Sequence, residues 1–116
     1  MAIDATNTKN ALCDAYKALA AFMAAYTAMG SAGSAGTEPA GGSPAYARKS
    51  VPWGSSSGGV VTSTGVVLDI PSGSTIVGVG FHTLAAAGVY VDKTTVTSQA
   101  FASQGTYTVT PTYTQT

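Results

Sequence analysis

A sixteen-residue run of turn-forming residues constrains this chain most, because it separates two parts with different hydrophobic patterns. Residues 30–45, GSAGSAGTEPAGGSPA, contain five glycines and two prolines. Ordering such a segment costs much backbone entropy, and its small side chains bury little apolar surface in return. We therefore predict a long loop at 30–45, mobile unless a partner fixes it. The parts on either side, 1–29 and 46–116, together fit one domain, 1–116.

The first part has the periodicity of an amphipathic helix. Five large residues recur at steps of three and four, as one face of a helix requires: Leu12, Tyr16, Leu19, Met23 and Tyr26. Asp4 or Thr6 is the predicted N-cap, because either side chain can accept a hydrogen bond from a free N–H of the first turn. Gly30 is a natural helix stop. Two alternatives remain for the second half: the helix continues, or Phe22–Thr27 leaves it and enters a sheet as a first strand.

The last part, 46–116, reads as short strands separated by turns. The strands are expected in Tyr46–Trp53, Gly59–Asp69, Thr75–Leu84, Gly88–Thr94, Gln99–Ser103 and Thr106–Thr114. Gly65 indicates a bulge or a hairpin turn inside the second of these. In the final segment, Tyr and Val alternate with Thr, which is the pattern of a half-buried antiparallel strand. The predicted fold class is mainly β, an antiparallel β-sandwich preceded by one N-terminal α-helix.

The low charge of the chain excludes several classes of partner. Only 9% of the residues are charged, and five basic residues balance five acidic ones. Nucleic acids need a clustered basic surface, and anionic membranes attract polybasic segments, so we expect neither as a partner. Thr, Ser and Gly in place of charges are typical of a surface that lies against other protein. Zero net charge also removes self-repulsion, so a homo-oligomer is expected.

The N-terminal sequence indicates a chain made in a cytoplasm. It has no basic region followed by an apolar run, as a signal peptide would. The apolar stretch Ala18–Ala28 is shorter than the roughly 20 residues that span a bilayer. Cys13 is the only cysteine, which excludes an intrachain disulfide, and its Ala- and Leu-rich surroundings predict a small buried side chain.

No catalytic motif is found, so we expect no enzyme, no cofactor and no metal. His82 is the only histidine, and on the strand predicted around it the side chain faces outward or toward a neighbouring subunit. The acids Asp4, Asp14, Glu38, Asp69 and Asp92 are too scattered for an acid–base pair or a calcium site. The glycine-rich Gly54–Gly59 lacks the Lys and Ser/Thr of a phosphate-binding loop.

Six side chains are interface candidates: Arg48, Tyr46, Trp53, Leu12, Tyr16 and Leu19. Arg48 either holds a carboxylate of a neighbouring subunit with its two-pronged guanidinium, or lies with Lys49 on an edge strand. Tyr46 and Trp53 suit the end of a core as well as an interface. The helix face that carries the other three is available for docking.

The ordered segments MAIDATNTKNALCDAY, GGSPAYARKSVPW, STIVGVGFHTL and QGTYTVTPTYTQT resemble a group of small virion structural proteins of tailed phages that infect actinobacteria. Such proteins are described as minor tail, tail-fibre-like or head-decoration proteins. The resemblance covers the whole chain. It implies that Phe22–Ala28 is the first strand, which shortens the helix to about Thr6–Ala20.

The resemblance implies a location in the virion and other virion proteins as partners. A minor tail or tail-tip accessory subunit is the first expectation, and a decoration protein that clamps major capsid subunits is the alternative. A third hypothesis is a carbohydrate-binding module for the host surface, with Trp53 and Tyr90 as the aromatic candidates.

Overall fold

The computed structural model describes residues 2–116, and the mainly β fold class predicted from the sequence is confirmed. Among these residues, one helix is followed by antiparallel strands. The elements are α1 Thr6–Leu19, β1 Phe22–Tyr26, β2 Lys49–Ser50, β3 Val60–Thr62, β4 Val66–Ile70, β5 Ser74–His82, β6 Tyr90–Phe101, β7 Gly105–Val109 and β8 Thr112–Thr114. No helix in residues 2–116 is long and apolar enough to cross a membrane.

A two-stranded ribbon runs along the molecule. β3 pairs with β8, and β4 pairs with β7, both antiparallel. The pairing shifts by one residue between the two halves, at 63–65 opposite Thr110–Pro111. Of the two alternatives predicted at Gly65, a bulge or a hairpin turn, the structure has the bulge. Pro111 cannot donate a backbone hydrogen bond. Its carbonyl accepts one from Ser63 N at 3.0 Å, which links the two strands where the pairing shifts.

A four-stranded antiparallel sheet in the order β2-β1-β5-β6 packs against the β4–β7 half of the ribbon. Met23 and Ala25 of β1 and Val79 of β5 meet Leu68 and Ile70 of β4 in the core between the layers. β6 is one long strand where two were predicted. It bulges where the partner of Ile76 is Gln99 but that of Gly78 is Thr95.

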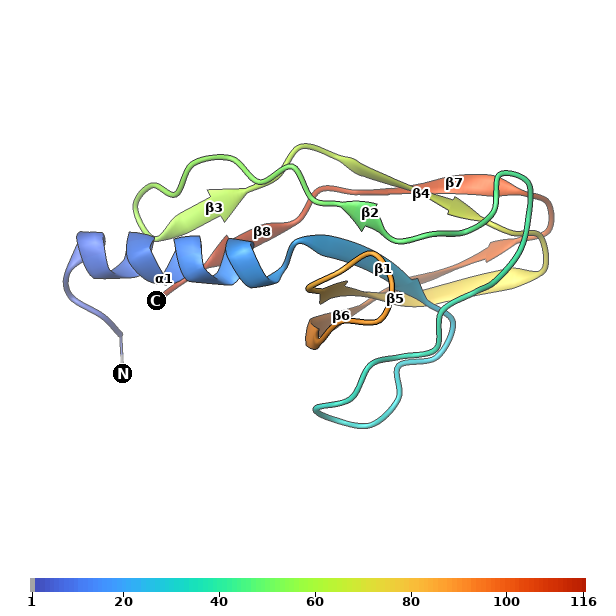
Figure 1. Cartoon of the computed structure of the whole chain (residues 1–116), viewed down its shortest axis with the longest axis horizontal. Helices are drawn as coiled ribbons and strands as arrows, with labels where there is room; N and C mark the ends of the chain where they lie inside the picture. The colour runs from blue at the N-terminus through green and yellow to red at the C-terminus, as the bar shows by residue number, and fades with distance from the viewer. Residues whose placement is uncertain (1) are drawn as a thin grey trace.

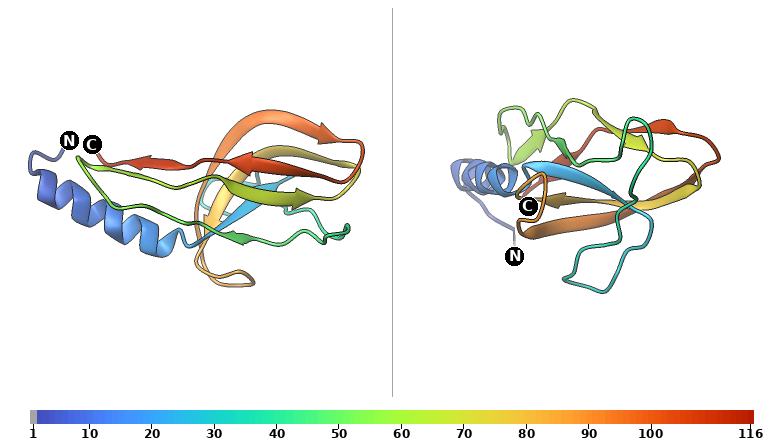
Figure 2. Two further views of the ribbon diagram at one scale, coloured as in Figure 1. Left: turned by 90° about the horizontal axis from the view of Figure 1, so that it is seen from above. Right: turned by 45° about the vertical axis from the view of Figure 1, so that its right-hand side comes forward.

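The helix packs on the other half of the ribbon (Figures 1 and 2). Tyr16 stacks on Tyr113 of β8, with ring centroids 3.8 Å apart. Asn10 Oδ1 accepts a hydrogen bond from Gly59 N at 2.9 Å. α1 ends at Leu19 and β1 follows at once, so Phe22–Tyr26 is a strand, as the second alternative had it. The helix and the sheet therefore lie end to end, and the molecule measures 47 × 27 × 26 Å.

Two details of the helix differ from the sequence prediction. The N-cap is Ala5, without a side-chain hydrogen bond, so neither Asp4 nor Thr6 has this role. Leu12 and Leu19 are 40% and 54% exposed. The buried face of α1 is instead centred on Cys13, and Tyr16 lies beside it.

The core between the layers gives a first prediction. Leu68 is fully buried, whereas the preceding Val67 is 48% exposed on the other face of the same strand. Leu68→Ala removes buried methyl groups and leaves a cavity, so it is expected to lower the free energy of unfolding by about 3 kcal/mol. Val67→Ala, measured by the same urea denaturation, is expected to change it by less than about 0.5 kcal/mol. Equal losses from the two variants would contradict this two-layer arrangement.

Candidate functional site

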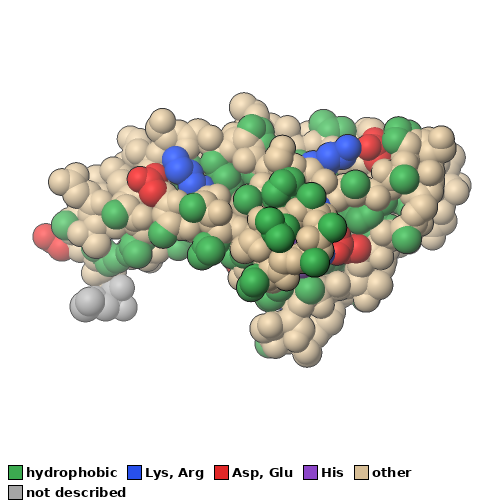
Figure 3. Space-filling view, in the orientation of Figure 1, with side chains coloured by type: hydrophobic (Ala, Val, Ile, Leu, Met, Phe, Trp, Pro, Cys, Tyr) green, Lys and Arg blue, Asp and Glu red, His purple; other side chains and the backbone are tan. Residues whose placement is uncertain are grey.

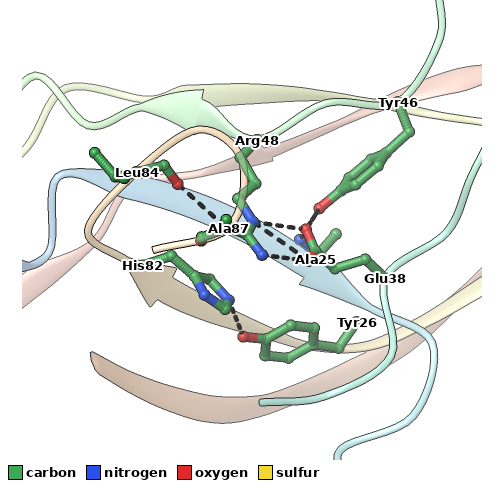
Figure 4. A network of polar contacts seen from close by, with 8 residues as sticks. All are labelled: Ala25, Tyr26, Glu38, Tyr46, Arg48, His82, Leu84 and Ala87. Atoms are coloured by element: carbon green, nitrogen blue, oxygen red, sulfur yellow. Dashed lines mark hydrogen bonds and ion pairs between the residues drawn. The ribbon is translucent and has the colours of Figure 1, made fainter. Parts of the chain in front are cut away.

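A cluster of polar side chains joins four separate segments along strands β1 and β5 of the four-stranded sheet (Figure 4). Tyr26 ends β1, and His82 ends β5. Glu38 comes from the glycine-rich loop, and Tyr46 and Arg48 come from the segment that leads into β2.

Arg48 is the centre of this cluster. Its Nε and Nη2 donate to the two carboxylate oxygens of Glu38, at 3.1 and 2.8 Å. Its Nη1 donates to the backbone carbonyls of Leu84 and Ala87, at 3.1 and 2.9 Å, and both belong to the hairpin between β5 and β6. The guanidinium therefore holds one carboxylate in bidentate fashion and, with its remaining nitrogen, fixes a second loop.

Glu38 and Tyr46 complete the cluster. The Tyr46 hydroxyl donates to Glu38 Oε1 at 2.7 Å and accepts from the backbone N–H of Ala25 at 3.1 Å. Partial burial acts to raise the pKa of Glu38, but the hydrogen bonds from Arg48 and Tyr46 outweigh it and hold that pKa below its ordinary value. Burial and the neighbouring Glu38 carboxylate raise the pKa of Tyr46. The carboxylate stays ionised and the phenol stays protonated at neutral pH.

Tyr26 and His82 form a second contact beside Arg48. The Tyr26 hydroxyl lies 2.6 Å from His82 Nε2. Gly80 makes this contact possible, because a Cβ at that position would overlap the Tyr26 ring and hydroxyl. Burial raises the pKa of Tyr26 to about 12. Burial, followed by the charge of Arg48, lowers the pKa of His82. Both groups are therefore uncharged at neutral pH.

The expected position of His82 is wrong. His82 is 3% exposed and is buried within its own chain, not on the surface. Val79 and Phe81 face the core between the layers, as the alternation predicted, so His82 does point to the other face. That face is covered by Tyr26, whose ring packs against His82 with centroids 6.1 Å apart, and the sequence pattern of β5 gives no sign of this cover.

Lys93 of β6 holds the glycine-rich loop at a second place. Its Nζ donates to the carbonyls of Met29, Ser31 and Ser34, at 2.6, 2.6 and 2.5 Å. Thr37 N also donates to Ala28 O at 2.8 Å. The loop predicted to need a partner to fix it is thus held by contacts within the chain.

The structure separates the six interface candidates. Arg48 binds the carboxylate of its own Glu38, so the interpretation that it holds a neighbour's carboxylate is wrong. Trp53 donates its indole N–H to Ala20 O at 2.8 Å and packs beside Tyr16 and Phe81. Tyr16 and Tyr46 are partly buried by their contacts. Leu12 and Leu19 are the candidates that stay largely exposed.

Most of the charges in this chain act within it. Eight of its ten charged side chains form a hydrogen bond or an ion pair with another part of the chain: Asp14, Lys17, Glu38, Arg48, Lys49, Asp69, Asp92 and Lys93. Sequence analysis missed the pairing of Glu38 with Arg48 and gave no role to Lys93. The available signal was that the only glutamate lies in an otherwise uncharged loop, ten residues before the only arginine.

The polar contacts of this cluster hold the glycine-rich loop and the β5–β6 hairpin against the sheet. Residues 2–116 contain no detected pocket. Within the same range, no three His, Cys, Asp or Glu side chains gather in a way that suits a metal ion. Comparisons with protein-family models, curated proteins and solved structures found no match to the chain.

The buried His82 predicts a loss of stability in mild acid. The folded chain resists protonation of His82, whereas the unfolded chain takes up the proton near pH 6.5. Stability is therefore expected to fall as the pH drops below about 6.5, by up to about 1.4 kcal/mol per pH unit, until the lowered pKa is passed. The Glu38 carboxylate becomes protonated only at lower pH, because its pKa is lowered. Thermal melting between pH 5 and 8 therefore reports on the protonation of His82.

His82→Gln is the control, because an amide can still bond to the Tyr26 hydroxyl but does not titrate. This variant is expected to melt at a temperature that changes little from pH 8 to pH 5. The same pH dependence in the variant and the natural chain would refute the assignment, since His82 is the only histidine.

Proposed function

We propose that this chain is a non-enzymatic structural protein of a phage virion, an accessory subunit of the tail that binds other virion proteins. The observation that carries the proposal is the internal use of charge. Ion pairs and hydrogen bonds within the chain occupy eight of the ten charged side chains and leave an exterior made mostly of Thr, Ser, Gly and Ala. Such an exterior suits lasting contact with other protein more than a free life in solution.

The loops support the same proposal. Long loops lose entropy when they dock, and this loss weakens association. Here Arg48 and Lys93 already hold the glycine-rich loop and the β5–β6 hairpin in one arrangement. A subunit that is fixed before it docks loses little further freedom in a repeated lattice, where many weak contacts add up.

The ordered resemblance to small virion proteins supplies the phage context and the first preference for the tail. The geometry of the aromatic residues gives less support to a carbohydrate-binding module. Trp53, one of its two aromatic candidates, packs among Tyr16 and Phe81 and is held by Ala20 O, so its ring is not free to stack on a sugar.

Quantitative mass spectrometry of purified particles tests this function. The chain should be present in washed virions of the phage that encodes it, in far fewer copies than the major capsid protein. It should be missing from purified heads without tails. Absence from washed virions would overturn the structural role. Copy numbers comparable to the major capsid protein, retained in tail-less heads, would overturn the tail location in favour of capsid decoration.

A further inference from the structure

Four of the five large exposed apolar side chains in residues 2–116 gather in two neighbouring places. Leu12 and Leu19 lie on α1 and are 40% and 54% exposed. Leu84 and Val89 lie in the β5–β6 hairpin and are 54% and 66% exposed. Ala15, also exposed, lies between the two helix leucines. We call these five residues the apolar patch.

The two halves of the apolar patch adjoin each other. Phe22 of β1 pairs with His82 of β5, so Leu19 and Leu84 are each a few residues beyond the same pair. Leu12 and Leu19 flank Tyr16, which donates to Asp92 Oδ2 at the start of β6 at 2.8 Å. Figure 3 shows apolar side chains along α1 and around the hairpin on one face of the molecule.

The hairpin half of the patch is held in place. Thr83 N donates to Val89 O at 3.0 Å, and Val89 N donates to Thr83 Oγ1 at 2.9 Å. Arg48 bonds to two carbonyls between these residues. Exposed apolar side chains on a fixed tip are in unfavourable contact with water in the free monomer, and they lose little entropy on binding. This combination favours a protein partner.

We propose that the apolar patch binds the same patch of a second copy of this chain, around a two-fold axis. The five residues of the patch are uncharged, and the acid beside it, Asp92, accepts a hydrogen bond from the Tyr16 hydroxyl of its own chain. The nearest helix charges, Asp14 and Lys17, lie on the other flank of α1 and bond to Ser56 and Gly54 O. A two-fold contact uses the same residues on both sides, and this uncharged patch is complementary to itself.

The size of the patch fits this partner. With the exposed alanines beside it, the patch measures roughly 500 Å², at the upper end of what a monomer exposes in one place. Two such patches together bury about 1,000 Å² plus their rims, which is about the smallest area expected of a biological interface. Leu12, Ala15 and Leu19 are spaced three and four apart, as in a helix–helix seam, and the small Ala15 lets two helices approach closely.

This inference goes beyond the proposed virion role, because it concerns the free chain and can hold or fail without any particle. Sedimentation equilibrium of the purified full chain tests it. The natural chain is expected to be a dimer at micromolar concentrations. Leu19→Ser with Leu84→Ser is expected to weaken dimerisation at least tenfold, with an unchanged circular dichroism spectrum, because both side chains are exposed.

Val67→Ser is the matched control. Val67 is 48% exposed but belongs to β4, outside the patch, so this variant should dimerise like the natural chain. A natural chain that stays monomeric up to about 1 mM would overturn the proposal. So would a dimer that survives Leu19→Ser with Leu84→Ser, or one that Val67→Ser weakens equally.

Discussion

The bidentate ion pair between Arg48 and Glu38 is the contact on which the arrangement of the loops depends. It is partly buried, with the two side chains 13% and 23% exposed, and both are further hydrogen-bonded. Glu38 accepts from Tyr46, and Arg48 donates to two carbonyls of the β5–β6 hairpin. Removing one partner of such a pair leaves the other charge partly buried without a counter-charge. The substitution of either residue is therefore costly, although the intact pair adds little net stability.

Lys93 fixes the other end of the glycine-rich loop in the same way, with its charged side chain. Three carbonyls converge on its ammonium group, and neutral oxygens rather than a carboxylate receive the charge. A chain with few charges thus uses them to order segments that its hydrophobic core does not reach. The exterior that remains carries few charges, and this links the internal contacts to both the proposed virion role and the apolar patch.

The sequence predicted those features that depend on local patterns. Alternation of Tyr and Val with Thr marked β7 and β8, and in the structure Tyr107 and Tyr113 are partly buried while the threonines between them are exposed. Gly65 marked the bulge of the ribbon. The antiparallel fold with one N-terminal helix follows from these patterns together.

Features that depend on partners far apart in the sequence were not predictable in this way. The helix periodicity selected Leu12 and Leu19, but the ribbon packs on the face around Cys13. Alternation placed His82 on the outer face of β5, yet Tyr26 covers that face. No local pattern shows that one arginine serves a carboxylate ten residues earlier and a hairpin some forty residues later.

Amide hydrogen exchange in Arg48→Met tests most directly whether this one side chain orders both loops. The amides of Thr83 and Val89 donate hydrogen bonds within the hairpin. Those of Thr27, next to the glycine-rich loop, and Thr37, within it, donate hydrogen bonds to backbone carbonyls. Lys49→Met is the control, because its ion pair with Asp69 lies outside the cluster. The account predicts faster exchange at all four amides in Arg48→Met alone, with the amides of β4 unchanged. Unchanged exchange at these four amides, or equal effects of the two variants, would contradict it.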